Sequence, residues 1–412
     1  MESILLALGL LVFIGHVLVA IFKHTRIPDV LLLIGIGVLL GPIGANWVQP
    51  EHFGRVGGVM TAIALVVILF EGGLGTELAS IGKAAVGTAS ITFASAAATV
   101  GLIAVVAQPY FGAWMPALLA GAVLSGTSSA VVMPMIAALK LGDKARTILA
   151  LESALTDVTC IVLTVGLLDA ATRGDASGAH LAGKALSSMI SAGVIGMIAG
   201  FGWLLIHERL REVPNTRLAI IAGVLVLYGL VESIGFSGGI AALAFGVTAG
   251  HLSRPGGPGT IAGRPIGRIS SDERQLFNEL VFLCKLVFFI YLGISLRFDS
   301  AAPYICAATA VGVVYAARIL LARWLLPRDC SVRDAVVTSI MAPKGLAAAV
   351  LASTVAQALA AAGHPLGEEI KTFVYAVVLV SIVVTSVLVP VIELPPSRWL
   401  AGKFFVGHTK LP

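Results

Sequence analysis

Continuous apolar runs of about 15 to 25 residues alternate along the chain with short polar segments. A helix of that length crosses the hydrocarbon core of a bilayer, which is about 30 Å thick. The runs lack the alternation of outward apolar and inward polar residues that the strands of a membrane barrel require. We therefore predict an all-α polytopic membrane protein with about thirteen transmembrane helices, at residues 3–21, 28–45, 57–72, 84–107, 115–139, 146–171, 183–206, 217–233, 237–251, 275–296, 301–324, 334–361 and 370–392.

The amino-acid composition is also typical of a membrane protein. Of 412 residues, 58% are hydrophobic and only 12% are charged, about half the charged share of a soluble domain. The net charge of +5 comes from basic residues beside the predicted spans, so it reflects membrane topology and does not indicate a nucleic acid partner. The four cysteines are scattered and predict neither a disulfide framework nor a metal site.

The distribution of Lys and Arg orients the predicted helices. Counted together with the two residues at each end of a span, the odd-numbered connections and the tail hold 19 of the 27 basic residues, and the even-numbered connections hold 5. Because cytoplasmic loops carry the excess of basic residues, we expect the N-terminus outside and the C-terminus, with a short tail at 394–412, in the cytoplasm. The membrane would be the inner (plasma) membrane. The three remaining bases, Lys285, Arg318 and Lys344, lie inside predicted spans.

Charged residues at membrane depth usually mark ion or proton pathways. The span 146–171 carries Glu152, Ser153, Thr156 and Asp157. On a helix Ser153 and Asp157 share one face, whereas the two acids lie about 140° apart. One acid can therefore pair with a base on another helix, while the other faces a wet cavity and exchanges a proton for a cation. The alternative is that both acids form structural ion pairs.

Two predicted spans contain residues that interrupt a helix. The span 115–139 has Gly126 among hydroxyl residues, with Pro134 beyond it, and the span 334–361 has Pro343-Lys344-Gly345. Such residues leave backbone N–H and C=O groups in mid-membrane without their helical hydrogen bonds. This is tolerated where those groups line a cavity or meet polar partners. Two interrupted helices, one in each half, are typical of a transporter site built from inverted repeats. The alternative is a pair of simple kinks between close-packed helices.

Short motifs follow one another in order along nearly the whole chain. They are Arg26-Ile27-Pro28, Gly35 to Pro42, Leu69 to Leu74, Leu124 to Ser129, Glu152-Ser153, Thr156-Asp157, Ala317-Arg318 and Lys344-Gly345. In these motifs the sequence resembles the monovalent cation/proton antiporter superfamily, specifically its NhaP-like and eukaryotic sodium/proton exchanger branch. The resemblance implies an NhaA-like antiporter fold with two crossing broken helices, and a homodimer.

The resemblance also implies roles for single residues. Asp157 would bind the proton or the cation, with Ser153 and Thr127 as further ligands of the cation. Glu152 would pair with Arg318, and Lys344 would offset the helix dipole ends that meet at the crossing. The whole candidate set for cation and proton binding is Asp157, Ser153, Thr127, Ser128, Thr156 and Glu152.

The chain departs from the family pattern in two places. Thr127-Ser128-Ser129 stands where many relatives have Thr-Asp-Pro, which is closer to the potassium-efflux branch. Thr156 stands where relatives have Asn or a second Asp. Because Thr does not titrate, we expect only Asp157 to change its charge at the site.

The expected function is antiport of Na⁺ or K⁺ against protons, and no cofactor is expected beyond these transported ions. If the site changes sides only when Asp157 is neutralised by one ligand or the other, the exchange is 1:1 and electroneutral. The alternative is a sodium-coupled symporter of organic anions with the same architecture. We do not expect an enzyme, because Leu141-Gly142-Asp143 lacks the second aspartate that a membrane aspartyl protease needs.

The resemblance further predicts how the single transporter unit, 1–393, is divided. Helices in 84–171 and 301–392 would form the ion-carrying core, and helices in 1–83 and 183–296 the scaffold and dimer interface. Alternating access would come from movement of the core against the scaffold. Lys285, in the scaffold part, is expected to reach the interface or to pair with Glu279, and the alternative is a role in the ion path. Glu71 is expected to be interfacial.

Overall fold

The computed structural model describes residues 9–18, 20, 29–50, 54–75, 85–139, 141–173, 178–210, 218–253, 260–261, 264–265, 269–328, 330–392 and 405. The beginning of the first predicted span, the motif Arg26-Ile27-Pro28 and the tail 394–412, apart from Phe405, lie outside the described residues.

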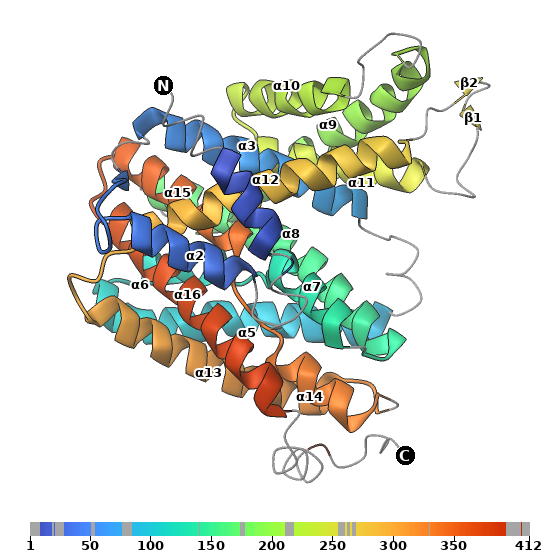
Figure 1. Ribbon diagram of the computed structural model, residues 1–412. Coiled ribbons are helices and arrows are strands. Elements are labelled where there is room, and N and C mark those ends of the chain that lie inside the picture. The colour runs from blue at the N-terminus through green and yellow to red at the C-terminus, as the bar shows by residue number, and fades with distance from the viewer. Residues whose placement is uncertain are drawn as a thin grey trace.

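Almost all of the described secondary structure is helical (Figure 1). The helices are Gly9–Leu18, α2 (Asp29–Leu40), α3 (Gly54–Gly75), α5 (Ala85–Phe111), α6 (Trp114–Val123), α7 (Ser129–Leu139), α8 (Asp143–Arg173), α9 (Gly178–Leu210), α10 (Ala219–Ser233), α11 (Gly238–Leu252), α12 (Ser271–Ser295), α13 (Ala302–Leu325), α14 (Val332–Ile340), α15 (Leu346–Ala361) and α16 (Gly367–Ile392). Between α11 and α12, strands β1 (Thr260–Ile261) and β2 (Arg264–Pro265) form a short antiparallel pair.

The helices follow the apolar runs, and each predicted span overlaps one of them. Six described helices are long and apolar enough to cross a bilayer, and seven further described segments are shorter apolar helices. The predicted spans 115–139 and 334–361 are each divided into two helices, as their Gly and Pro residues suggest. The all-helical membrane fold is therefore confirmed, while the number of crossings and the inverted repeats stay predictions.

Contacts divide the helices into two groups (Figure 1). In one group α11 packs against α3, α9 and α10, and α12 packs against α2 and α3. In the other group α5 packs against α6, α8 and α13, and α16 packs against α13 and α15. The groups meet where α15 contacts α3 and α8 contacts α9. The candidate acids on α8 therefore lie close to the boundary between the two groups.

The helices α2 and α12 approach each other closely in the first group. A Cβ atom at Gly37 would lie 2.8 Å from the Cα atom of Gly293, and a Cβ atom at Gly293 would be as close to Gly37. Only glycine allows the two backbones to come so near. This contact holds the backbones of α2 and α12 close together.

Candidate functional site

The two interruptions meet at the centre of the molecule. The first lies between α6 and α7, at residues 124–128, and the second between α14 and α15, at residues 341–345. The amide of Ser128 donates to the carbonyl of Pro343 at 2.8 Å, so the two irregular segments satisfy each other's backbone groups. A Cβ atom at Gly345 would collide with the Ser128 side chain, which explains the glycine at this crossing.

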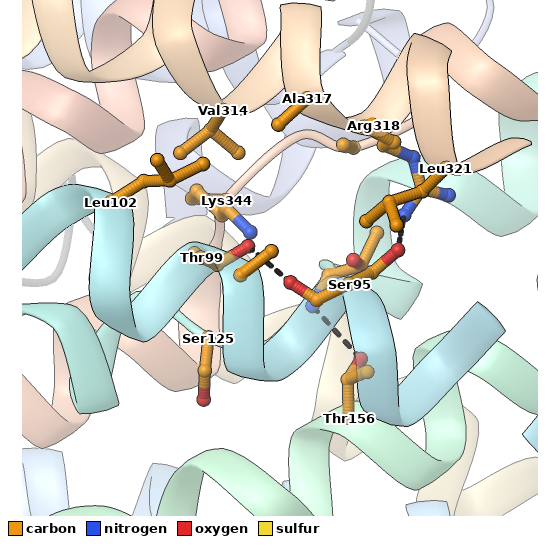
Figure 2. A pocket seen from close by; sticks show the side chains of 13 residues that line it. Ser95, Thr99, Leu102, Ser125, Thr156, Val314, Ala317, Arg318, Leu321 and Lys344 are labelled. Atoms are coloured by element: carbon orange, nitrogen blue, oxygen red, sulfur yellow. Dashed lines mark hydrogen bonds between the residues drawn. The ribbon is translucent and has the colours of Figure 1, made fainter. Parts of the chain in front are cut away.

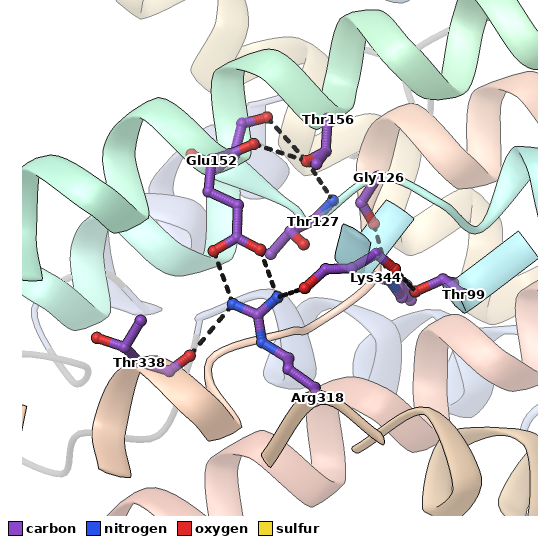
Figure 3. Close-up of polar contacts among 10 residues, drawn as sticks. Thr99, Gly126, Thr127, Glu152, Thr156, Arg318, Thr338 and Lys344 are labelled. Carbon is purple, nitrogen blue, oxygen red and sulfur yellow. Dashed lines mark hydrogen bonds and ion pairs between the residues drawn. The ribbon is translucent and has the colours of Figure 1, made fainter. Parts of the chain in front are cut away.

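Lys344 lies at the crossing with its ammonium group buried. Its Nζ donates to the carbonyl of Gly126 at 3.1 Å (Figure 3). Its backbone amide donates to Ser381 Oγ of α16 at 2.9 Å. The C-terminal ends of α6 and α14 both point to this place, and helix C-termini carry partial negative charge. The positive charge of Lys344 therefore complements the carbonyl ends that meet there.

Thr156 connects the first interruption to α8. Its hydroxyl donates to the carbonyl of Glu152 at 2.8 Å and accepts from the amide of Thr127 at 3.0 Å (Figure 3). The Thr156 side chain thus replaces a backbone hydrogen bond that the broken helix loses. This contact places the break directly beside the two acids.

Glu152 forms a buried ion pair with Arg318 of α13 (Figure 3). The two Nη atoms of Arg318 each donate to one carboxylate oxygen of Glu152, with 2.8 Å between Nη2 and Oε2. Nη2 also donates to the carbonyl of Thr338 at 3.1 Å, and Nη1 to Ser95 Oγ at 3.4 Å. With Glu152 1% and Arg318 4% exposed, such a bidentate pair fixes both charges in place.

Asp157 faces a different environment, a cavity of about 440 Å³ between the two groups of helices. The lining residues are Ile68, Leu69, Glu71, Gly72, Ser128, Met133, Ala150, Ser153, Asp157, Leu243, Asn278, Val281, Phe282, Lys285, Leu346 and Ala347. The hydroxyl of Ser153 donates to the carbonyl of Ala150 at 3.1 Å, which leaves oxygen lone pairs for a cation. The cavity thus brings together Asp157, Ser153 and Ser128 from the candidate set.

Thr127 and Thr156 line a second, much smaller cavity at the crossing (Figure 2). Its volume of about 10 Å³ corresponds to about one water molecule. Ser95 and Thr99 of α5, together with Lys344, contribute polar atoms to its wall. The structure therefore separates the candidate ligands into those beside Asp157 and those on this second side.

The expected pairing of Lys285 with Glu279 is wrong. The Nζ of Lys285 lies 2.6 Å from Asp29 Oδ2, at the start of α2, and Glu279 is exposed. Lys285 also lines the Asp157 cavity, together with Asn278 and Val281. Helical spacing could have indicated this, because the three residues share one face of α12. The partner could not be found in the same way, since Asp29 lies 256 residues away in the sequence.

Glu71, for which an interfacial position is predicted, also lines the cavity of Asp157. It is partly buried near the end of α3. The helical spacing of Ile68, Gly72 and Glu71 on α3 is compatible with one cavity-facing side. The cavity therefore contains a carboxylate that the sequence analysis did not include in the site.

Comparisons with known proteins identify the family of the chain. The family model described as the transmembrane sodium/hydrogen exchanger matches residues 9–393. The K(+)/H(+) antiporter NhaP2 of Shewanella sp. (strain MR-4) is 25% identical over 96% of this chain and 68% of its own length. The K(+)/H(+) antiporter NhaP of Alkalimonas amylolytica is 24% identical over 85% of this chain and 61% of its own length.

A solved structure has the same fold. The sodium proton antiporter MjNhaP1 from Methanocaldococcus jannaschii at pH 8 superimposes with a TM-score of 0.73 over 94% of this chain and 100% of that chain, at 20% identity. Because the family model covers nearly the whole chain, the chain belongs to the sodium/hydrogen exchanger family of multi-pass membrane proteins and is a cation/proton antiporter.

Proposed function

We propose that the protein exchanges one proton for one monovalent cation, Na⁺ or K⁺, at Asp157 without net movement of charge. The observation that carries this proposal is the different environment of the two acids on α8. Glu152 is held by Arg318, so its charge stays constant, whereas Asp157 lines a cavity with two hydroxyl groups. Competition between a proton and a cation for Asp157 couples their movements in opposite directions.

The chemistry of the cavity suits a cation that sheds part of its water shell. Asp157 supplies a negative oxygen, and Ser128 and Ser153 supply neutral oxygens from the broken helix and from α8. Oxygen ligands of this kind can replace the hydration shell of an alkali cation. Either ligand of Asp157 brings the same charge to the site, so the loaded core crosses the membrane field with a constant charge.

Alternating access follows from the position of the cavity between two groups of helices. In this proposal the core, α5 to α8 and α13 to α16, slides against a scaffold that contains α2, α3 and α9 to α12. The scaffold forms a homodimer in the inner membrane, with the N-terminus outside. Asn278 and Ala150 line the cavity near the starts of α12 and α8, which supports a site that is open to the cytoplasm.

The proposed function is tested by dequenching of a pH-sensitive dye in everted vesicles. Additions of Na⁺, Li⁺, K⁺ and Rb⁺ at graded pH should each be compared with a choline control. We expect at least one alkali cation to release protons in a saturable way. Proton release without any dependence on the cation, or uptake of Na⁺ that requires an organic anion, would contradict antiport.

Electroneutral exchange predicts that the rate is independent of membrane voltage. With the voltage clamped near zero by valinomycin and K⁺, the rate of Na⁺-driven proton exchange in proteoliposomes should equal the rate at an imposed potential. The reason is that Asp157 is neutralised equally by a proton or a monovalent cation. A rate that changes steeply with the imposed potential would reject 1:1 stoichiometry.

Glu71 should strengthen cation binding through its charge. We expect Glu71→Gln to raise the half-saturating cation concentration roughly threefold to tenfold, because a carboxylate in the cavity concentrates cations near Asp157. Exchange should stay electroneutral in this variant. Cation titrations of the dequenching rate would measure the effect, with Glu279→Gln, an exposed carboxylate, as the matched control. An unchanged half-saturating concentration would show that Glu71 does not act on the site.

A further inference from the structure

Asp29 and Lys285 form a buried ion pair within the proposed scaffold. Lys285 lies near the middle of α12, and Asp29 is the first described residue of α2. Asp29 Oδ2 accepts from Lys285 Nζ at 2.6 Å, and Asp29 Oδ1 accepts from the amide of Val30 at 3.0 Å. Asp29 is 7% and Lys285 9% exposed. The carboxylate is therefore held by its own helix as well as by the lysine.

Lys285 also belongs to the wall of the cavity that contains Asp157. Asp29 does not line this cavity, so the ion pair draws the ammonium group toward α2. Among the described residues, the titratable groups that line the cavity are Asp157, Glu71 and Lys285. A cation that approaches Asp157 thus passes a lysine on the scaffold side and a carboxylate on α3.

A lysine ammonium is itself a monovalent cation, attached to the protein by a flexible chain. A group tethered in the wall of the same cavity as a carboxylate, and able to reach it, would bind it at a high effective concentration and exclude a free competitor. An unrestrained Lys285 would therefore oppose cation binding at Asp157, or at Glu71 in the wall of the same cavity.

We infer that Asp29 is a positioning residue that keeps Lys285 out of the cation site and so sets the cation affinity of Asp157. This inference rests on the proposed function, in which Asp157 binds the transported cation. The close contact of Gly37 with Gly293 makes α2 and α12 one unit. The ion pair consequently stays intact while the core moves past it.

The test replaces Asp29 with Asn. The half-saturating cation concentration of Asp29→Asn should rise about tenfold or more, while the maximal rate at saturating cation stays within about twofold of the wild type, as for a competitive inhibitor. Addition of Lys285→Met should return the half-saturating concentration to the wild-type value. Asp29→Glu, which retains the negative charge, should behave like the wild type.

A purely structural role for the ion pair gives a different result. Asp29→Asn and Lys285→Met would then both lower the melting temperature and the maximal rate, and the half-saturating concentration would not change. That outcome overturns the inference. Glu279→Gln removes a negative charge from an exposed position of α12 and serves as the control. It should leave the half-saturating cation concentration and the maximal rate unchanged.

Two further measurements keep the test decisive. If Asp29→Asn does not fold, Lys285→Met alone decides: a half-saturating concentration below the wild-type value supports the inference, and an unchanged or raised value overturns it. Stabilisation of the purified protein by Na⁺ or K⁺ in a melting assay distinguishes a wrong cation site at Asp157 from a wrong role for Asp29. If Asp157→Asn is stabilised as the wild type is, the proposed site fails. If only Asp29→Asn is stabilised as the wild type is, this inference alone fails.

Discussion

Replacement of Asp157 by Asn is expected to abolish cation-dependent dequenching in everted vesicles while the protein stays folded. Asn has nearly the same size and can keep the same position on α8, but it cannot bind a proton and carries no charge for a cation. Since Asp157 lines the cavity and not the buried ion pair, the change should not break a structural contact with Arg318. The loss should therefore appear in transport and not in the melting temperature.

The matched control for this variant is Asp272→Asn, which changes an exposed aspartate in the first turn of α12. It should exchange protons at the wild-type rate, because it lies outside the cavity lining. Wild-type exchange by Asp157→Asn would remove Asp157 from the mechanism. The comparison at equal amounts of purified protein excludes differences in expression.

Glu152→Gln and Arg318→Gln should each destabilise the protein by about 3–5 kcal/mol, because removal of one partner leaves a buried charge without compensation. Because the contact is bidentate and both residues are almost completely buried, removal of either partner should cost a large part of the folding stability. The measurement is thermal unfolding of the purified protein in detergent, followed by size-exclusion chromatography. Transport should fall together with the amount of folded protein.

Two comparisons make the ion-pair prediction specific. Arg146→Gln removes an exposed arginine from α8, the helix of Glu152, and should change stability by no more than about 0.5 kcal/mol. The charge swap, Glu152→Arg with Arg318→Glu, should recover part of the stability that either single variant loses. A fully stable and active Arg318→Gln would contradict the importance of the pair.

Much of the fold was predictable because a membrane helix is determined by local composition. The apolar runs gave the positions of the helices, and the Gly and Pro residues of the two interrupted spans gave the breaks. The contact between Glu152 and Arg318 could be predicted for a related reason. Charges inside the bilayer are so few that each must find one of a handful of partners, and the resemblance to a family indicated which one.

The remaining features depend on packing between distant parts of the chain. Asp29 reaches Lys285 only because α2 and α12 meet through Gly37 and Gly293, and no local pattern connects these positions. Lys285 was therefore assigned the nearer carboxylate on its own helix. The separation of Thr127 from Ser128 into two cavities likewise follows from the path of a non-helical segment, for which helical spacing gives no guide.

The two cavities at the crossing also bear on energy conservation. A proton can move through a protein by hopping along a file of hydrogen-bonded waters, and such a file would dissipate the gradient that drives exchange. The cavity of Asp157 and the cavity of about 10 Å³ beyond the crossing share no lining residue among those described. Neighbouring residues of one irregular segment, Thr127 and Ser128, face opposite ways and stand between them. The irregular segment between α6 and α7 thus contributes to the walls of both cavities, and its position would interrupt a continuous file of waters between them.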